Sequence, residues 1–433
     1  MKKLCLLLLA SIICAPFSGW CYTFLDMAMG SQVFGGSSKC LGMGEVGLLV
    51  EEGPFAASTN PAILGWQKGT HISGSYKFFS IDDRWSMPMH DSFDALLGYM
   101  AYSHNSNLYH DGSFGCSTDM LLKNLGLVLG LTFTRAYDFT YDFHEEVRDR
   151  STSSVPSDKV IADAFLRGRG GLKSFSIGVG KTAGRDLSVG ASLEYLYGDF
   201  KISSRLENID LNLMTCWRDS LTETEDRLVA SDLSGMRLRT GISFRMGERL
   251  EVALCGVTSC NLDGSYKATQ GDLLYFLSTK DSTGDFEITY PESYSFGFKY
   301  RPRNELATTI EANMTFARWK NSDNTSLRSL NLDNTYQFNI GIEHIFYNGR
   351  PVRFGFTYRQ SPLDHETGEA AITAGSGVNF AGFNLDFAGK IGWREYRYYD
   401  LFDDSIFCAK PRYFTDKVEE TVLSGMITLS RRF

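Results

Sequence analysis

Proline, long apolar runs and excess positive charge are all scarce in this chain. Only 10 of its 433 residues are proline, whereas 42 are glycine and 13% are aromatic, a balance that suits many strands joined by tight turns. After the first 21 residues no stretch approaches the roughly 18–20 apolar residues that a membrane-spanning helix requires, which excludes a helical inner-membrane protein. The acidic balance, with 51 acidic and 43 basic residues, disfavours nucleic acid as a partner.

The start of the chain has the pattern of an export signal. Lys2 and Lys3 form a basic beginning, and an almost unbroken apolar run follows over residues 4–14. A small-residue cleavage site after Cys21 predicts a signal peptide over residues 1–21. The mature chain would carry a net charge of −10, because the removed segment holds two lysines and no acidic residue. We therefore expect an exported protein that is periplasmic, secreted or in the outer membrane.

Metal-binding and catalytic motifs are also missing from the sequence. The six cysteines after residue 21 match no zinc or redox spacing, and the seven histidines form no paired zinc-binding spacing. We interpret the cysteines as isolated small apolar residues, with one loop disulfide as the alternative; they are Cys40, Cys116, Cys216, Cys255, Cys260 and Cys408. The sequence predicts no enzyme, no cofactor and no metal site, although a catalytic site assembled from distant residues would leave no local motif.

Apolar and polar residues alternate along the chain with the period of a β-strand. Residues 187–197 alternate in this way, and so do residues 236–246, 294–301 and 352–359. A strand of a membrane barrel turns one face to lipid and the other to the lumen, and about 9–11 of its residues cross the membrane. A soluble sandwich also alternates, so this pattern alone does not distinguish the two folds.

The lengths of the connections favour the membrane barrel. From about residue 139 onward, links of a few residues alternate with long polar links, like the short periplasmic turns and longer outer loops of outer-membrane barrels. The long links lie at about 139–173, 201–235, 261–292, 320–334 and 395–420. We count eleven strands from residue 174 to the end and place three more at about 70–80, 92–103 and 125–138. The predicted fold is all-β, a transmembrane antiparallel β-barrel of about 14 strands, although residues 104–125 are long for a periplasmic turn.

The final predicted strand ends on Phe433, with apolar residues at alternate positions before it. This ending resembles the C-terminal signal that barrel-assembly machinery reads, with Leu429 and Phe433 as its signal residues. Arg431 departs from that pattern, because an aromatic or apolar residue is commoner there. We therefore predict a barrel over residues 67–433 in the outer membrane of a Gram-negative-type bacterium, with lipid, lipopolysaccharide and the assembly machinery as partners.

Residues 22–66 lack the alternation of barrel strands. Gly42 and Gly44 let the backbone turn tightly or pack closely, and Pro61 holds Asn60 out of the helical region. A compact segment before the first strand could fill the lumen, which widens with strand number and would otherwise form an aqueous channel. We therefore predict an N-terminal hatch, or plug, over residues 22–66.

The same segment carries a family resemblance. Leu41-Gly-Met-Gly44, followed about sixteen residues later by Asn60-Pro61-Ala62, resembles the N-terminal signature of the FadL-like superfamily. That superfamily includes long-chain fatty acid transporters of the outer membrane and the PorV/PorQ group of type IX secretion. The resemblance implies a 14-stranded barrel with an internal hatch. The hatch residues are Gly42, Gly44, Asn60, Pro61 and Ala62, which either move when a ligand binds or form a turn that only seats the plug.

Two functions follow as hypotheses. The first is an outer-membrane channel for passive uptake of small hydrophobic molecules such as long-chain fatty acids. The second is a PorV-like accessory, or shuttle, protein of type IX protein secretion, which would bind other secretion proteins through its long loops. A purely structural barrel is a third possibility, and no local motif marks residues that contact a ligand.

Overall fold

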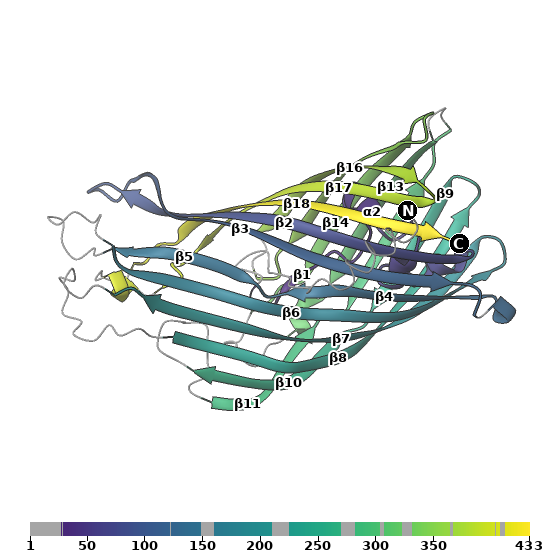
Figure 1. The fold of residues 1–433 in the computed structure, drawn as a ribbon. Helices are drawn as coiled ribbons and strands as arrows, with labels where there is room; N and C mark the ends of the chain where they lie inside the picture. The colour runs from purple at the N-terminus through teal and green to yellow at the C-terminus, as the bar shows by residue number, and fades with distance from the viewer. Residues whose placement is uncertain are drawn as a thin grey trace.

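The chain forms a single antiparallel sheet that is rolled into a barrel (Figure 1). The first barrel strand, β2 (Thr70–His90), pairs along most of its length with the last, β18 (Asp416–Arg432), so the barrel is closed. The computed structural model describes residues 27, 29–121, 123–148, 160–209, 225–269, 282–303, 307–322, 331–363, 367–402, 404–407 and 412–433. The predicted signal peptide lies outside these residues.

The described residues form 14 barrel strands, as the sequence predicted. Between β2 and β18 come β3 (Leu96–Thr118), β4 (Leu127–Asp138), β5 (Tyr141–Arg148), β6 (Val160–Ala183), β7 (Leu187–Glu207), β8 (Glu225–Met246), β9 (Leu250–Val257), β10 (Cys260–Thr269), β11 (Ser282–Tyr290), β12 (Ser293–Tyr300), β13 (Ala307–Ala317), β14 (Thr335–Ile345), β15 (Pro351–Gln360), β16 (Gly368–Phe380) and β17 (Phe383–Tyr398). The segments β4 and β5 both pair with β6, and β9 and β10 both pair with β8. In the same way β11 pairs with β10 and β12 with β9. Each of these three pairs is therefore one barrel strand with a two-residue interruption.

Short turns mark one end of the barrel as periplasmic. The β6–β7, β8–β9 and β16–β17 connections are only a few residues long, and they lie at the end where the N–H of Phe433 donates to the carbonyl of Thr70 (2.8 Å). Short turns and both termini are periplasmic in bacterial barrels. The predicted periplasmic link over residues 104–125 is wrong, because β3 continues to Thr118. The first two predicted strands are also too short, since β2 and β3 extend far above the membrane.

The outward faces of the strands form an apolar belt. In β7 the side chains of Val189, Leu193 and Tyr195 are exposed on the outside, whereas those of Ser192 and Glu194 are buried on the inside. This alternation matches a strand with lipid on one face and a filled lumen on the other. It confirms the strand pattern that the sequence predicted.

On the outer side of the apolar belt the strands continue, but there their inward faces are apolar and their outward faces are polar. Beyond Gly198, the inward residues Phe200 and Ile202 of β7 are buried and apolar, while Lys201 and Arg205 point outward. The predicted long outer loops at 139–173, 201–235, 261–292 and 395–420 are therefore wrong for the most part, because β5–β6, β7–β8, β10–β11 and β17–β18 run through them. Outward charges gave these segments the composition of loops, but an alternating strand with water outside has the same composition.

An apolar core fills the barrel above the belt. Trp85 is fully buried there and contacts Phe143 edge to face, with ring centroids 5.6 Å apart. The ring of Phe139 stacks on that of Phe200 with centroids 4.1 Å apart. This core resembles the interior of a soluble β-protein, so the outer part of the barrel is a folded extension rather than a set of loops.

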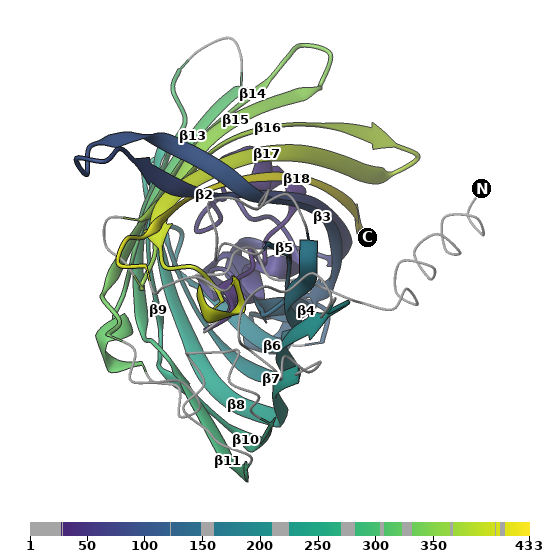
Figure 2. The ribbon, with the colours of Figure 1, turned by 90° about the vertical axis from the view of Figure 1, so that its left-hand side faces the viewer.

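Residues 29–66 lie inside the barrel (Figure 2). Their β1 (Ser31–Gln32) pairs with β4, and their helices α2 (Ser38–Gly42), η1 (Pro54–Ala57) and η2 (Pro61–Trp66) contact the inner wall. None of the helices in the described part of the chain is long and apolar enough to span a membrane. We refer to residues 29–66 as the hatch segment; the boundaries at 22 and 66 remain a prediction.

Candidate functional site

Glycines on the inner wall allow the hatch segment to lie directly against the barrel. A Cβ atom on Gly355 of β15 would collide with the backbone of Met43 and Gly44, and Gly42 contacts the backbone of Gly375. Gly44 has a φ of +75°, a left-handed conformation that glycine adopts without strain. Its N–H donates to Thr373 Oγ1 (2.8 Å) and its carbonyl accepts from Asn339 (2.6 Å). Both predicted glycines thus lie where the hatch segment meets the wall.

The residues Asn60-Pro61-Ala62 form the beginning of η2. Asn60 caps this helix, because its Oδ1 accepts from the N–H of Ala62 (3.2 Å), while its Nδ2 donates to the carbonyl of Leu48 (2.8 Å). Ser188 of β7 donates to the carbonyl of Ala62 (2.6 Å). These contacts place the beginning of η2 against β7, and a purely seating role for it remains a prediction. A movement of these residues upon ligand binding remains a prediction.

Buried ion pairs also join the hatch segment to the wall. Glu45 is buried, and its carboxylate accepts from Lys390 Nζ (3.0 Å) and lies 3.4 Å from Arg359 Nη2. Burial alone would raise the pKa of Glu45, but Lys390 and Arg359 outweigh it and lower this pKa below its ordinary value. Lys390 also pairs with Glu369 (2.7 Å), so the network extends along the wall.

A second network holds two guanidinium groups on one carboxylate. Glu194 of β7 is buried and pairs with Arg237 (2.6 Å) and Arg239 (2.5 Å) of β8. Arg239 also donates to the carbonyl of Thr59 in the hatch segment (3.3 Å). Sequence reasoning missed these residues, although their signal was present: each occupies a position of its alternating strand that faces the lumen.

Backbone groups of the hatch segment are held by further charged side chains. Glu311 of β13 accepts from the N–H groups of Leu48 (3.0 Å) and Leu49 (3.2 Å). Lys299 of β12 donates to the carbonyl of Leu49 (3.0 Å) and pairs with Glu251 (2.6 Å). Buried charges in such pairs are costly to separate, so these contacts oppose movement of the segment.

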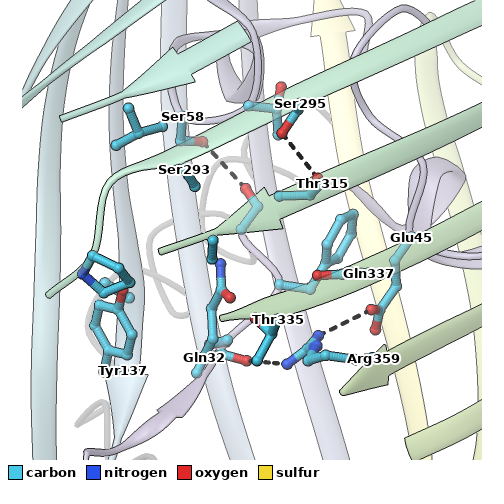
Figure 3. A pocket seen from close by; sticks show the side chains of 18 of the residues that line it. Gln32, Glu45, Ser58, Tyr137, Ser293, Ser295, Thr315, Thr335, Gln337 and Arg359 are labelled. Atoms are coloured by element: carbon cyan, nitrogen blue, oxygen red, sulfur yellow. Dashed lines mark hydrogen bonds and ion pairs between the residues drawn. The ribbon is translucent and has the colours of Figure 1, made fainter. Parts of the chain in front are cut away.

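A cavity of about 240 Å³ lies between the hatch segment and the wall. Figure 3 shows Ser295, Thr315 and Gln337 on the wall side, with Gln32 and Glu45 on the hatch side. Its lining is of mixed polarity. Apolar side chains are provided by Met29, Val33, Phe34, Leu48, Trp319 and Leu363, and arginines by Arg135, Arg237, Arg239, Arg359 and Arg394. The cavity thus suits a small molecule with both apolar and polar parts.

The barrel wall is interrupted beside this cavity. The strands β3 and β4 are paired only from Phe114↔Phe133 to Thr118↔Leu129, although both continue further toward the outside. Arg135, which lines the cavity, lies there with its Nε 3.6 Å from Asp111 Oδ1 across the interruption. An ion pair therefore replaces the backbone ladder at this point.

The C-terminal residues lie at the periplasmic end of the belt. Leu429 pairs with Gly74 of β2, and the Phe433 side chain is exposed. The guanidinium of Arg431 lies over the rings of Phe383 (4.8 Å) and Phe433 (4.6 Å), a cation–π arrangement that accounts for an arginine at this position. Recognition of Leu429 and Phe433 by assembly machinery remains a prediction.

The described cysteines are unpaired. They are Cys40, Cys116, Cys255 and Cys260, and Cys216 and Cys408 lie outside the described residues. The thiol of Cys40 donates to Glu51 (3.0 Å) within the hatch segment. The part of the chain that the structure describes contains no group of three or more residues that could hold a metal ion.

Comparison with known proteins gives both a family and a fold. Residues 120–383 match the model of the BamG family, and no curated protein matches the chain. A FadL homologue from Pseudomonas aeruginosa has a similar structure, with a TM-score of 0.65 and 12% identity over 93% of this chain and 100% of that one. The toluene transporters TbuX of Ralstonia pickettii (TM-score 0.58, 15% identity, 92% and 99% covered) and TodX of P. putida (0.60, 15%, 93% and 99%) are similar too. The fold is thus FadL-like, and a closed barrel with an outward apolar belt belongs in the bacterial outer membrane.

Proposed function

The chain belongs to the BamG family, and from its FadL-like fold and internal cavity we propose that it is a channel, rather than an enzyme. It would take up small hydrophobic molecules passively across the outer membrane, with long-chain fatty acids as one candidate class. The observation that carries this proposal is the cavity between the hatch segment and the wall, whose lining residue Arg135 lies beside the interruption between β3 and β4. A molecule in the cavity could leave sideways there without crossing the hatch segment.

The size and lining of the cavity restrict its ligand. At about 240 Å³ it is smaller than the roughly 300–1,000 Å³ of typical ligand pockets. A small aromatic or short amphiphilic molecule therefore suits it better than an extended long-chain acid. The long-chain acid would fit only if the hatch segment moved, which the buried ion pairs of Glu45 oppose.

A tryptophan at Gln337 tests this function. Gln337 of β14 lines the cavity, and its neighbour Tyr336 is exposed on the outer face. We expect Gln337→Trp to fill the cavity and to reduce cellular uptake of radiolabelled toluene and oleate to the level of the deletion strain. Tyr336→Trp, at the same level of the wall, should leave uptake unchanged. Equal uptake by the deletion strain and the complemented strain for both substrates would dismiss the transport proposal.

A protein-binding role is a second candidate, and the family match favours it. The match to BamG over residues 120–383 suggests an association with barrel-assembly machinery. A PorV-like accessory role in type IX secretion is the related alternative. The folded extension above the belt supports either role, because it provides an outer surface of outward charged and polar side chains.

Depletion of the protein separates these roles from transport. An accessory of barrel assembly should leave other outer-membrane barrels unfolded in the periplasm, seen as loss of their heat-modifiable migration in gels. A secretion accessory should instead leave cargo proteins in the periplasm while barrels fold normally. Normal barrel assembly together with normal secretion would rule out the protein-binding role.

A further inference from the structure

The last strand, β18, closes the barrel against β2 along a seam that ends on the outer side of the apolar belt (Figure 1). The outermost pair of this seam is Lys417↔Ser86, and Asp83 and Glu420 form a directly opposed pair three residues further in. The side chains of Asp83 and Glu420 both face the interior, and these residues are only 1% and 2% exposed. Two buried carboxyl groups therefore lie on neighbouring strands near the outer end of the closing seam.

The surroundings of Asp83 are apolar and provide it with neutral hydrogen-bond donors. Its carboxyl group accepts from the hydroxyl of Tyr141 (2.6 Å) and from the indole N–H of Trp85 (3.1 Å). Trp85 itself is fully buried and packs against Phe143. No basic side chain in the described part of the chain forms an ion pair with Asp83. A negative charge on Asp83 would therefore be buried without a counter-charge, which is costly in an apolar core.

Glu420 has a different environment. The guanidinium of Arg394 lies 3.9 Å from its carboxylate, and the hydroxyl of Tyr396 donates to it (2.7 Å). Like charges directly opposite on neighbouring strands repel one another, with Cβ atoms about 4.5–5.5 Å apart, so Glu420 opposes ionisation of Asp83. The other charged groups of the adjoining described strands are Glu145 of β5 and Asp416 of β18, which lie further out on the inner face, and Asp82 and Arg84 of β2, which point outward.

The protonation of Asp83 depends on whether the seam is closed. Asp83 lies beyond the membrane-spanning part of β2, because its neighbours Asp82 and Arg84 place charge on the outward face. Burial raises the pKa of Asp83 to about 6, although Tyr141 and Trp85 act in the opposite direction. In an opened seam the carboxyl group would meet water, with an ordinary pKa of about 3.9. The proton therefore stabilises closure fully below about pH 3.9, and this contribution is lost as the pH rises to about 6.

We propose that Asp83 is a pH-sensitive clasp of the closing seam. In its protonated form Asp83 fits the apolar core without a buried charge, and the outer ends of β2 and β18 stay paired. When Asp83 ionises, an uncompensated charge faces Glu420 in the core, which favours separation of the strand ends and exposure of the carboxylate to water. The outer part of the barrel is therefore closed more tightly in acid than at neutral pH.

Amide hydrogen exchange of the purified full-length chain in detergent tests the clasp. The opening equilibrium is measured at the amides of residues 83–86 and 417–420, after correction for the intrinsic pH dependence of exchange. We expect it to increase roughly 100-fold between about pH 4 and about pH 7. Asp83→Asn should remove most of this increase, because the amide side chain does not titrate. Tyr141→Phe should move the midpoint to higher pH, since it removes a donor to the carboxylate.

Asp82 provides the matched control, because it is adjacent in sequence but points outward and contacts His104 (2.9 Å). Asp82→Asn should leave the response intact, which separates the clasp from titration of His104. Heat-modifiable migration verifies that each variant has folded. Corrected exchange that does not change with pH, an increase of more than about tenfold that survives Asp83→Asn, or loss of the response in Asp82→Asn would each overturn the proposal. This inference does not depend on transport, so failure of uptake in the Gln337→Trp test leaves it intact.

Discussion

Replacement of Glu45 by alanine is expected to release the hatch segment from the barrel wall. The change leaves the buried Lys390 with Glu369 alone and the partly buried Arg359 without its Glu45 partner, and removing one partner of a buried ion pair costs about 3–5 kcal/mol. Labelling of the buried thiol of Cys40 by a maleimide, followed by mass spectrometry, measures the release. We expect labelling to become roughly 100-fold faster or more than in the unmodified chain.

Glu52 provides the matched control within the hatch segment. Its side chain is 70% exposed and pairs with Lys39 at 3.3 Å, and exposed pairs contribute at most about 1 kcal/mol. Glu52→Ala should therefore leave Cys40 protected. Equal labelling rates for Glu45→Ala and Glu52→Ala would show that the buried network does not hold the hatch segment.

The Glu45 network also predicts a dependence on pH. The pKa of Glu45 is lowered, because Lys390 and Arg359 outweigh the effect of burial. Its stabilising contribution is thus complete above the ordinary glutamate pKa of about 4.3 and is lost as the pH falls through the lower pKa of the folded state. Cys40 is labelled with the maleimide while the protein is held at each pH, and the reaction is then quenched at neutral pH. The labelling should increase in acid. Glu45→Gln should remove the part of this response that Glu45 contributes.

Valine at Gly355 is expected to displace the hatch segment by steric collision. The added Cβ would fall on the backbone of Met43 and Gly44, and Gly44 is fixed there by hydrogen bonds to Thr373 and Asn339. Overpacking of a filled interior costs about 1–3 kcal/mol, which corresponds to roughly 5- to 150-fold faster labelling of Cys40.

A lipid-facing glycine controls for the effect of valine on the barrel itself. Gly389 of β17 is exposed on the outer face, and the nearest atom to a Cβ there is the carbonyl oxygen of Ser424, at 3.8 Å. Gly389→Val should therefore fold normally and keep Cys40 protected. Unchanged protection in a folded Gly355→Val variant would mean that the wall accommodates the side chain and that the glycine is not required for seating.

Much of the barrel is encoded locally. Alternation along each strand, as in residues 187–197, depends only on which neighbours face lipid and which face the lumen, so the fold and the number of strands were predictable. The same reasoning failed above the belt, because it treated charged positions such as Lys201 and Arg205 as loop residues. There the outward face meets water, and the polarity of the two faces is exchanged.

The amino-acid sequence by itself determined the export signal pattern, the 14 alternating strands and a separate N-terminal segment with the signature at Asn60. Only the tertiary structure decided which lumen residues meet, since Glu45 and Lys390 are 345 residues apart and come together only after the sheet closes. It also decided that the pairing of β3 with β4 extends only from Phe114 to Thr118 on the β3 side, because strand register, and not local composition, determines where a ladder stops. Local patterns encode the period of a strand, whereas closure and register depend on the whole sheet.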